Sequence, residues 1–359
     1  MDFGLSDEQE MLQATVRSFV ANECPPTRQH EIFDAPSEHV PALWRGLSEL
    51  GAVGLAIPEP HGGAGLEVLD LALVAEALGE GGLPGPFFGH VVAALAIARA
   101  GSPAQQAAWL PRLATGDAIA TVAFGEADGV WQPGDWTCDA AGDRLRGAKL
   151  AVPCADVADV VVVGTRGGGL ALVEARGAGV AATAVESVDR TRRVHALAFD
   201  GAPCEPLAHG ADAAPGVRDA ALVLCAADAF GAAWSLLRTT IDYCGTREQF
   251  DTPLTQFQAV KHQIADCALD VEPTRALWWY AAHAVDQLPD EAPRAAALAK
   301  AHVTDRAMQV ARECVELHGG IGFTWECDVH MGFKRIQFDR AFLGAPEEHR
   351  LRFAELSGW

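Results

Sequence analysis

The chain shows three successive patterns of apolar residues, and their order limits what it can fold into. Up to about residue 115, apolar residues recur at helical spacing, beginning with a helix capped by Ser6. From Gly116 to about 213 there are short β-type runs separated by Gly, Pro and Asp, which predict a compact β-barrel or sandwich. After Pro215 the helical pattern returns. We therefore expect a mainly α protein with a β middle domain, divided at 1–115, 116–213 and 214–359.

The expected elements follow from the same periodicities. After the first helix, which should end near 22–26, helices are expected at 37–50, 66–79, 86–101 and 103–114, then at 219–243, 256–285 and 292–318, with a final pair from Asp328 onwards. Strands are expected at 119–124, 159–163, 170–173 and 194–199.

The net charge argues against two classes of partner. The 359 residues carry a formal charge of −21, from 48 acidic and 27 basic residues, and contain no block rich in Lys or Arg. Such a chain repels nucleic acid and anionic membrane surfaces, so neither is expected as a partner. No apolar run is expected to span a bilayer. An anionic ligand would have to be met by locally placed arginines.

Cysteine usage and the N-terminus indicate a cytoplasmic protein. The nine cysteines are scattered, odd in number and never spaced as CxxC, which argues against a disulfide framework or a zinc site. The first ten residues are acidic and lack the apolar core of a signal peptide. No second metal ligand follows His318 or His330 at the fourth residue along the helix, so no metal site is expected.

Two motifs predict a bound pyrophosphate. The first is TREQF at 246–250, and the second is HGGIGFTWE at 318–326; both lie at the ends of expected helices. An arginine at one helix end and paired glycines at another provide a charged fork and a backbone that a ligand can approach closely. Alternatively, Arg247 only closes a helix and the glycines only cap one. Three glycines within four residues exceed what a cap needs.

At these motifs the chain resembles the acyl-CoA dehydrogenase family, and the resemblance covers essentially the whole sequence. Members carry TREQFG-type and QxxGGIGFT-type motifs that hold the ADP half of FAD across a subunit interface. The resemblance implies an N-terminal helical domain, a β-barrel domain and a C-terminal four-helix bundle, assembled as dimers or tetramers. It also implies FAD-binding roles for Arg247, Gln249, Phe250, Leu254, Phe257, Gly319, Gly320 and the residue at position 316.

The chain departs from the family pattern at several of these positions. Asp251 replaces a glycine, and Glu316 replaces a glutamine that would donate a hydrogen bond to the diphosphate. Two family motifs that surround the flavin ring are changed as well: GEADG stands at 125–129 and KLAVPC at 149–154. Their threonine hydroxyls and stacking tryptophan are replaced by Gly125, Pro153 and Ala151. We therefore expect weaker support for the ring.

Both positions where the family places its catalytic glutamate lack a carboxylate. A base is needed to remove the α-proton of a thioester as hydride leaves the β-carbon. The two positions hold Leu343 and Ala220. Asp228 is the best remaining acid, with the alternative that it is a buried acid paired with an arginine.

Two hypotheses for the function remain. In the first, the chain completes an FAD site in a heteromeric acyl-CoA dehydrogenase, a heterotetramer that desaturates an acyl-CoA from fatty acid or steroid catabolism. Its partners would then be a second acyl-CoA dehydrogenase subunit and, by family analogy, an electron-transfer flavoprotein. In the second, it is an independent dehydrogenase that uses an atypical acid such as Asp228. A binding module without catalytic function is a more distant alternative.

Overall fold

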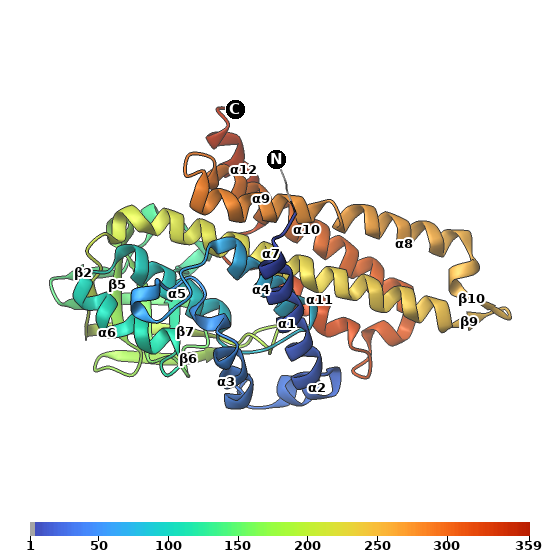
Figure 1. Cartoon of the computed structure of the whole chain (residues 1–359), viewed down its shortest axis with the longest axis horizontal. Helices are drawn as coiled ribbons and strands as arrows, with labels where there is room; N and C mark the ends of the chain where they lie inside the picture. Colours follow the sequence, from blue (N-terminus) through green and yellow to red (C-terminus); the bar gives the residue numbers. More distant parts are fainter. Residues whose placement is uncertain (1–3) are drawn as a thin grey trace.

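The structure is a computed structural model that describes residues 4–359, apart from the side chain of Asp128. Residues 1–3 lie outside the described residues. They begin the ten-residue segment that was not expected to be a signal peptide. The chain begins with a helical region, shown in blue and cyan in Figure 1. Its α-helices are α1 (Asp7–Glu23), α2 (Pro26–Asp34), α3 (Pro41–Glu49), α4 (Val68–Glu80), α5 (Phe87–Ala100) and α6 (Pro103–Ala114).

Capping residues set where these helices begin. The Ser6 side chain accepts a hydrogen bond from the Gln9 amide at 3.2 Å, and the Gln9 side chain accepts one from the Ser6 amide at 3.1 Å. Ser102 and Gln105 repeat this capping box at α6. Helix α2 was not expected from the sequence. It begins with Pro26 at its first position, where a proline costs no hydrogen bond.

The middle region is a β sandwich of two four-stranded sheets within the described residues. One sheet has the order β1-β4-β5-β8 and the other β2-β3-β7-β6. Leu145 and Phe199 of the second sheet pack with Val161 and Val163 of the first. The strands are β1 (Ala120–Ala123), β2 (Asp139–Ala141), β3 (Arg144–Pro153), β4 (Val160–Thr165), β5 (Gly169–Glu174), β6 (Val180–Val185), β7 (Val194–Pro203) and β8 (Glu205–Pro206).

The C-terminal region is a helical bundle that extends away from the sandwich (Figure 1). Helix α7 begins before Pro215 rather than at residue 219, and Pro273 divides the expected segment 256–285 into two helices because proline lacks an amide hydrogen. The helices are α7 (Gly210–Thr246), α8 (Gln258–Val271), α9 (Thr274–Gln287), α10 (Ala292–His318), α11 (Val329–Ala341) and α12 (Pro346–Leu356). The short strands β9 (Glu248–Gln249) and β10 (Thr252–Pro253) form a hairpin between α7 and α8.

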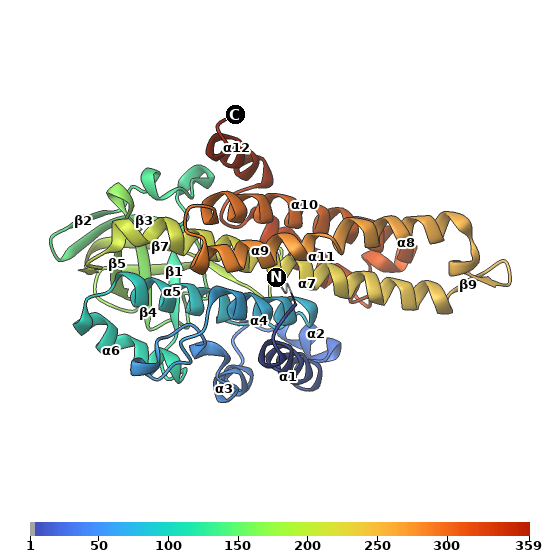
Figure 2. The same cartoon turned by 45° about the horizontal axis from the view of Figure 1, so that its top comes forward.

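Helix α7 is the central element, and it packs against both helical regions. It contacts α4 and α5 on one side and α9, α10 and α11 on the other, and Figure 2 shows it running between them. A Cβ atom on Gly79 would lie 2.1 Å from the Asp228 carbonyl, and one on Gly231 would lie 2.0 Å from the Glu76 carbonyl. Glycine at both crossing positions therefore lets the α4 and α7 backbones approach closely.

Helix α7 contains a longer apolar stretch than expected, since no run was expected to be long enough to span a bilayer. By length and composition alone, Gly210–Thr246 could cross a membrane. However, 89% of its most apolar window is buried against the other described helices, as in the core helix of a globular protein. The division into domains at 115/116 and 213/214 stays a prediction. The helical, β and helical order that motivated it is present in the structure.

Candidate functional site

A pocket lies beside the second motif, HGGIGFTWE at 318–326, and we call it the glycine-turn pocket. It has a volume of about 750 Å³. The end of α10 contributes Arg312, Val315 and Glu316, and the following turn contributes Gly319, Gly320, Gly322, Phe323 and Trp325. Helix α11 contributes His330, Phe333, Lys334 and Gln337, while Val188 comes from the β6–β7 connection. Three of the expected cofactor-binding residues, Glu316, Gly319 and Gly320, therefore line one pocket.

Backbone geometry explains why glycine follows α10. Gly319 has a φ of 65°, in the left-handed region where a side chain would be strained, and it ends the helix. Cβ atoms added at Gly319 or Gly320 would meet nothing within 4 Å. The pocket wall is therefore bare backbone open to the hollow, so a ligand could approach the chain closely there.

The glycine-turn pocket also contains cations that sequence reasoning did not assign to it. Arg312 and Lys334 line it, together with the anionic Glu316. The Lys334 ammonium lies 4.8 Å from the ring centre of Phe33 and 5.0 Å from that of Trp325. Burial and the neighbouring Arg190 lower the pKa of Lys334. A motif search could not find these positions, because their role depends on α11 folding back beside the end of α10.

The first motif lies close to the second in space but does not line the same pocket. Tyr243, one turn before Arg247, stacks on His318 with 4.3 Å between ring centres. Beyond it the chain enters the β9–β10 hairpin at the far end of the bundle (Figure 1). The described lining of the glycine-turn pocket includes none of the other expected cofactor-binding residues: Arg247, Gln249, Phe250, Leu254 and Phe257.

The hairpin has a two-residue turn that presents an aromatic side chain to solvent. Phe250 and Asp251 have φ values of 54° and 57°, as a tight two-residue hairpin turn requires. Asp251 tolerates the conformation that the family's glycine would adopt more easily. The Phe250 side chain is 90% exposed. The TREQF motif is therefore exposed, lies outside the described lining of the glycine-turn pocket and is available to another molecule.

A second hollow, the middle-domain pocket, adjoins the glycine-turn pocket and has no cation in its described lining. Its volume is about 270 Å³, and it shares Val188 and Gln337 with its neighbour. Glu186 and Asp189 line it, while its described lining contains no Lys or Arg. The remaining walls are largely apolar and come from Trp131, Ala151, Val194, Phe338, Ala341 and Phe342.

Aromatic side chains pack tightly along one wall of the middle-domain pocket. The Phe342 ring lies 5.1 Å from the rings of Trp131 and Phe338 and 5.5 Å from that of Phe88, measured between ring centres. Phe88 comes from α5, Trp131 from the sandwich and Phe342 from the α11–α12 connection. This cluster therefore joins the three regions of the chain with apolar contacts.

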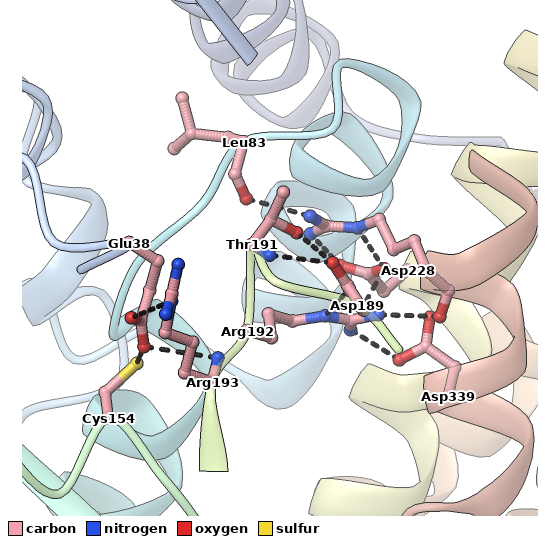
Figure 3. Close-up of polar contacts among 10 residues, drawn as sticks. Glu38, Leu83, Cys154, Asp189, Thr191, Arg192, Arg193, Asp228 and Asp339 are labelled. Carbon is pink, nitrogen blue, oxygen red and sulfur yellow. Dashed lines mark hydrogen bonds and ion pairs between the residues drawn. The ribbon is translucent and has the colours of Figure 1, made fainter. Parts of the chain in front are cut away.

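Asp228 takes part in a buried ion-pair network, which we call the ionic junction and define by Asp189, Arg192, Asp228, Arg335 and Asp339 (Figure 3). Arg335 donates to both Asp228 oxygens, at 2.8 and 2.6 Å. Arg192 donates to Asp339 at 2.6 Å and to Asp189 at 3.0 Å, and lies 3.4 Å from Asp228. These contacts fit the alternative that Asp228 is a buried acid paired with arginines.

The two aspartates that face each other in the junction have pKa values shifted in opposite directions. Burial alone would raise the pKa of Asp228, but Arg335 and Arg192 hold it below its usual value. Burial raises the pKa of Asp339 well above its usual value, and the charge of Asp228 adds to this effect. Asp228 is therefore ionised and engaged by Arg335, so it is unsuited to accept a proton near neutral pH.

Comparisons with known proteins match the same regions. Residues 6–117 match the family model described as "Acyl-CoA dehydrogenase, N-terminal domain", and residues 219–357 match "Acyl-CoA dehydrogenase, C-terminal domain". The chain is 34% identical over 354 residues to "Acyl-CoA dehydrogenase IpdE2" of Mycobacterium tuberculosis, which covers 98% of each chain. The chain belongs to the acyl-CoA dehydrogenase family.

Two solved structures share the fold of this acyl-CoA dehydrogenase over nearly its whole length. The "Tcur3481-Tcur3483 steroid ACAD G363A variant" has a TM-score of 0.91 and 32% identity, and the match covers 98% of each chain. The "ChsE4-ChsE5 complex from Mycobacterium tuberculosis" has a TM-score of 0.90 and 31% identity, covering 100% of this chain and 99% of that one. The expected acyl-CoA dehydrogenase fold, mainly α with a β middle region, is confirmed.

The positions where this acyl-CoA dehydrogenase would carry its glutamate are enclosed and apolar. Leu343 is 1% exposed and sits in the α11–α12 connection with a φ of 63°. Ala220 is fully buried against Val68 and Leu95. The adjacent Asp219 is buried as well and lies 2.8 Å from Arg352. The nearest carboxylate to Ala220 in sequence is thus already paired.

The segments that would surround a flavin ring in this acyl-CoA dehydrogenase instead bind each other. Lys149 is fully buried and donates to Glu126 at 2.5 Å, and Thr137 donates to the same carboxylate. Burial lowers the pKa of Lys149, while hydrogen bonds from Lys149 and Thr137 outweigh burial and hold the pKa of Glu126 below its usual value. Gly125 also pairs with Leu150 through the backbone. These polar groups are therefore occupied within the chain.

Of the two pockets, one fits part of an FAD molecule and the other does not. The glycine-turn pocket offers cations, aromatic faces and bare backbone, which suit a phosphorylated tail. The middle-domain pocket has no Lys or Arg in its described lining, its Asp189 is paired with Arg192, and the polar side chains of its neighbouring motifs are already paired. The residues present there do not fit an isoalloxazine ring that needs hydrogen-bond donors.

Proposed function

We propose that this chain is a subunit of a heteromeric acyl-CoA dehydrogenase and that it completes an FAD site centred on a second subunit. The contrast between the linings of the two pockets carries the proposal. The features suited to a dinucleotide tail are present, whereas the middle-domain pocket has no Lys or Arg in its described lining and the base positions hold Leu343 and Ala220. FAD, when bound in the complex, accepts the hydride that leaves the β-carbon of the acyl-CoA.

In this proposal the chain's own residues bind and position, and the second subunit supplies the proton-abstracting acid. Arg247 would pair with the pyrophosphate of the partner's cofactor, Gln249 would hydrogen-bond it, and Phe250, Leu254 and Phe257 would pack near its adenine. The exposure of the Phe250 hairpin supports this assignment, because it is free to reach a neighbouring molecule. Gly319 and Gly320 would let the tail approach the backbone.

The similar proteins support a paired assembly and an acyl-CoA substrate. One similar structure is described as a complex of two named chains, and another as a steroid dehydrogenase with a paired name. We therefore propose a heterotetramer that acts on a fatty or steroid acyl-CoA and passes electrons to an electron-transfer flavoprotein. We also propose a cytoplasmic location, which is supported by the nine free cysteines.

The alternative, an independent dehydrogenase with Asp228 as base, is less well supported. Both Asp228 oxygens accept hydrogen bonds from Arg335, and Arg192 lies beside them. To act as a base, Asp228 would have to break a buried charged pair, which costs about 3–5 kcal/mol.

Flavin content tests the proposal directly. The chain purified alone should be colourless, whereas a co-expressed second acyl-CoA dehydrogenase subunit should yield a yellow complex with one FAD for every two subunits. Arg247→Ala should lower the FAD content of that complex, because the pyrophosphate loses a charged partner. Arg166→Gln, which changes an exposed arginine of the middle region, is the matched control and should leave the content unchanged.

Two results would contradict the proposal. One is a yellow chain that oxidises an acyl-CoA with an artificial acceptor without any partner. The other is an Arg247→Ala complex that retains its full FAD content.

A further inference from the structure

A third hollow lies between the N-terminal helices and the C-terminal bundle, and the proposed function does not use it. Its volume is about 300 Å³, and α1, the end of α4, α7 and α11 contribute to its walls. It shares no described lining residue with the glycine-turn pocket or the middle-domain pocket. We call it the inter-helix pocket and define it by its buried apolar wall, which consists of Val20, Cys24, Ala232, Leu236, Val329 and Met331.

The inter-helix pocket offers no unpaired charge to a ligand. Burial raises the pKa of the Cys24 thiol to about 11, so this group is neutral at pH 7. The charged residues of the described lining all have partners within the chain: Arg335 pairs with Asp228, Glu80 with Arg17 and Arg238, and Asp328 with His30. A charged ligand would lose its hydration here without gaining a counter-charge, so the pocket favours a neutral one.

Three uncharged polar groups of the pocket have no hydrogen-bond partner among the described residues. Ser235 and Thr239 lie one turn apart on α7, and neither hydroxyl makes the bond to the carbonyl four residues earlier that Thr240 makes at 2.8 Å. The Gln29 side chain donates to two carbonyls through Nε2, but its Oε1 atom accepts no bond from a described residue. A ligand hydroxyl matches this set, because it can donate to the amide oxygen and accept from a hydroxyl.

The buried wall favours a carbon skeleton over water. A water molecule in a cavity needs about two to four polar partners, and the side chains of this wall offer only the Cys24 thiol. Pockets that hold small molecules begin at about 300 Å³, which is the volume found here. Ser235 is half-buried and Thr239 is exposed, so the polar groups lie nearer to solvent than the apolar wall.

We propose that the inter-helix pocket binds a neutral, mainly apolar alcohol. Its carbon skeleton packs on the buried wall, and its hydroxyl exchanges hydrogen bonds with Ser235, Thr239 and Gln29. Such a ligand contacts the N-terminal helices and the bundle together, so its binding stabilises their packing. Because Arg335 lines the pocket and also holds Asp228, the ligand adjoins the ionic junction. This site goes beyond the proposed function and does not depend on FAD.

Binding of decahydro-2-naphthol to the full-length chain tests the site by isothermal titration calorimetry. This probe has two fused apolar rings and one hydroxyl. The wild-type chain should bind it and should unfold at a higher temperature in its presence. Decahydronaphthalene-2-carboxylate has the same rings with a negative charge, and it should bind about tenfold more weakly because the described lining provides no unpaired cation.

Variants of the pocket locate the binding. Ala232→Leu should weaken binding of the alcohol by about tenfold or more, because the added carbons occupy the hollow. Ser235→Ala and Thr239→Val should each weaken it by about fivefold, since each removes one hydroxyl. Ser235→Ala adds no volume, so it tests the site independently of any change in the packing of α7. Thr183→Val, which removes an exposed hydroxyl of β6, is the matched control and should bind as the wild type does.

Three results would overturn the proposal. The first is no binding of decahydro-2-naphthol at millimolar concentration, and the second is equal affinity for the alcohol and the carboxylate. The third is wild-type affinity in both Ala232→Leu and Ser235→Ala, which would place the binding elsewhere. The FAD content of the co-expressed complex tests the proposed function separately, and none of these three results bears on it.

Discussion

At the scale of single residues, Asp228 and Asp339 show how burial and neighbouring charges together shift the pKa values of two aspartates in opposite directions. The folded pKa of Asp228 is lowered, so it stabilises the fold above the unfolded pKa of about 3.9, and this contribution is lost as pH falls through the folded pKa. The folded pKa of Asp339 is raised, so its contribution to stability depends on pH in the opposite direction. Its contribution is present at acidic pH and is lost as pH rises from about 3.9 through the folded pKa.

Amide variants should therefore behave in opposite ways. Asp228→Asn should destabilise the chain by about 3–5 kcal/mol at pH 7, because Arg335 loses its charged partner in a buried site. Asp339→Asn should be at least as stable as wild type, since it keeps the acceptor for Arg192 without an ionisable group. Urea unfolding between pH 4 and 8 would measure both. Equal destabilisation by the two variants would contradict this assignment.

Only part of the site could be predicted from the sequence. Glu316, Gly319 and Gly320 line one hollow, and their roles in binding FAD stay predictions. The roles assigned to Arg247 and to the rest of its motif stay predictions, because they depend on a second molecule. Lys334 and His330 could not be assigned, since a histidine and a lysine four residues apart on a helix acquire meaning only from the Trp325 and Phe33 rings around them.

At the scale of elements, the α11–α12 connection is held by a buried lysine from α10. Lys300 is fully buried and donates to the carbonyls of Arg340 at 3.1 Å and Gly344 at 2.9 Å. His349 adds a contact to the Leu343 carbonyl at 3.0 Å. These bonds fix Leu343 in its left-handed conformation. Burial lowers the pKa of Lys300 to about 8.

The stability contributed by this connection should change with pH in the alkaline range. An unfolded lysine has a pKa of about 10.4, so between about 8 and that value the unfolded chain binds a proton that the folded chain lacks. The free energy of unfolding of the wild type should therefore receive a contribution that increases with pH across this window, and Lys300→Met should lack that contribution. At pH 7 the variant should lose about 1–3 kcal/mol for each carbonyl left without a donor.

Chemical denaturation from pH 7 to 10 would measure this difference. Lys261→Met, which removes an exposed lysine of α8, is the control and should retain the wild-type slope. A Lys300→Met chain with the wild-type pH slope would exclude Lys300 as its source.

Which elements could be predicted depended on how regular their patterns are. The long apolar periodicity of α4, α5, α7 and α10 was sufficient to find them, although α7 begins earlier than expected. Strands β3 and β6 were not found. In β3 the buried Lys149 interrupts the apolar pattern, and β6 is largely exposed. A charged side chain that is buried by its own ion pair cannot be recognised from periodicity.

At the scale of the whole molecule, the ionic junction connects all three regions. Arg192 enters from the β6–β7 connection and donates to Asp339 and to the Arg335 carbonyl of α11. Arg335 in turn donates to the Leu83 carbonyl, between α4 and α5. Hydrogen bonds from Arg192 and from its neighbour Arg335 thus connect the sandwich to both helical regions (Figure 3).

Removing Arg192 should weaken the coupling between the regions. Arg192→Met should cost about 3–5 kcal/mol, because it leaves the buried Asp189 carboxylate without its cation and an Asp339 oxygen without its donor. In calorimetry the sandwich should then unfold at a lower temperature than the helices, so that one transition becomes two. Arg166→Gln, a surface change in the same region, should retain the wild-type profile. A single unshifted transition for Arg192→Met would show that the junction does not couple the regions.

The solvent-facing Phe250 at the hairpin tip has a consequence for how the protein can be made. If this ring belongs to an apolar surface that a partner normally covers, that surface promotes self-association when the partner is absent. We expect the chain to precipitate or form soluble aggregates when synthesised in excess over its partner. Balanced synthesis of the two subunits would then matter as much for yield as the stability of either one.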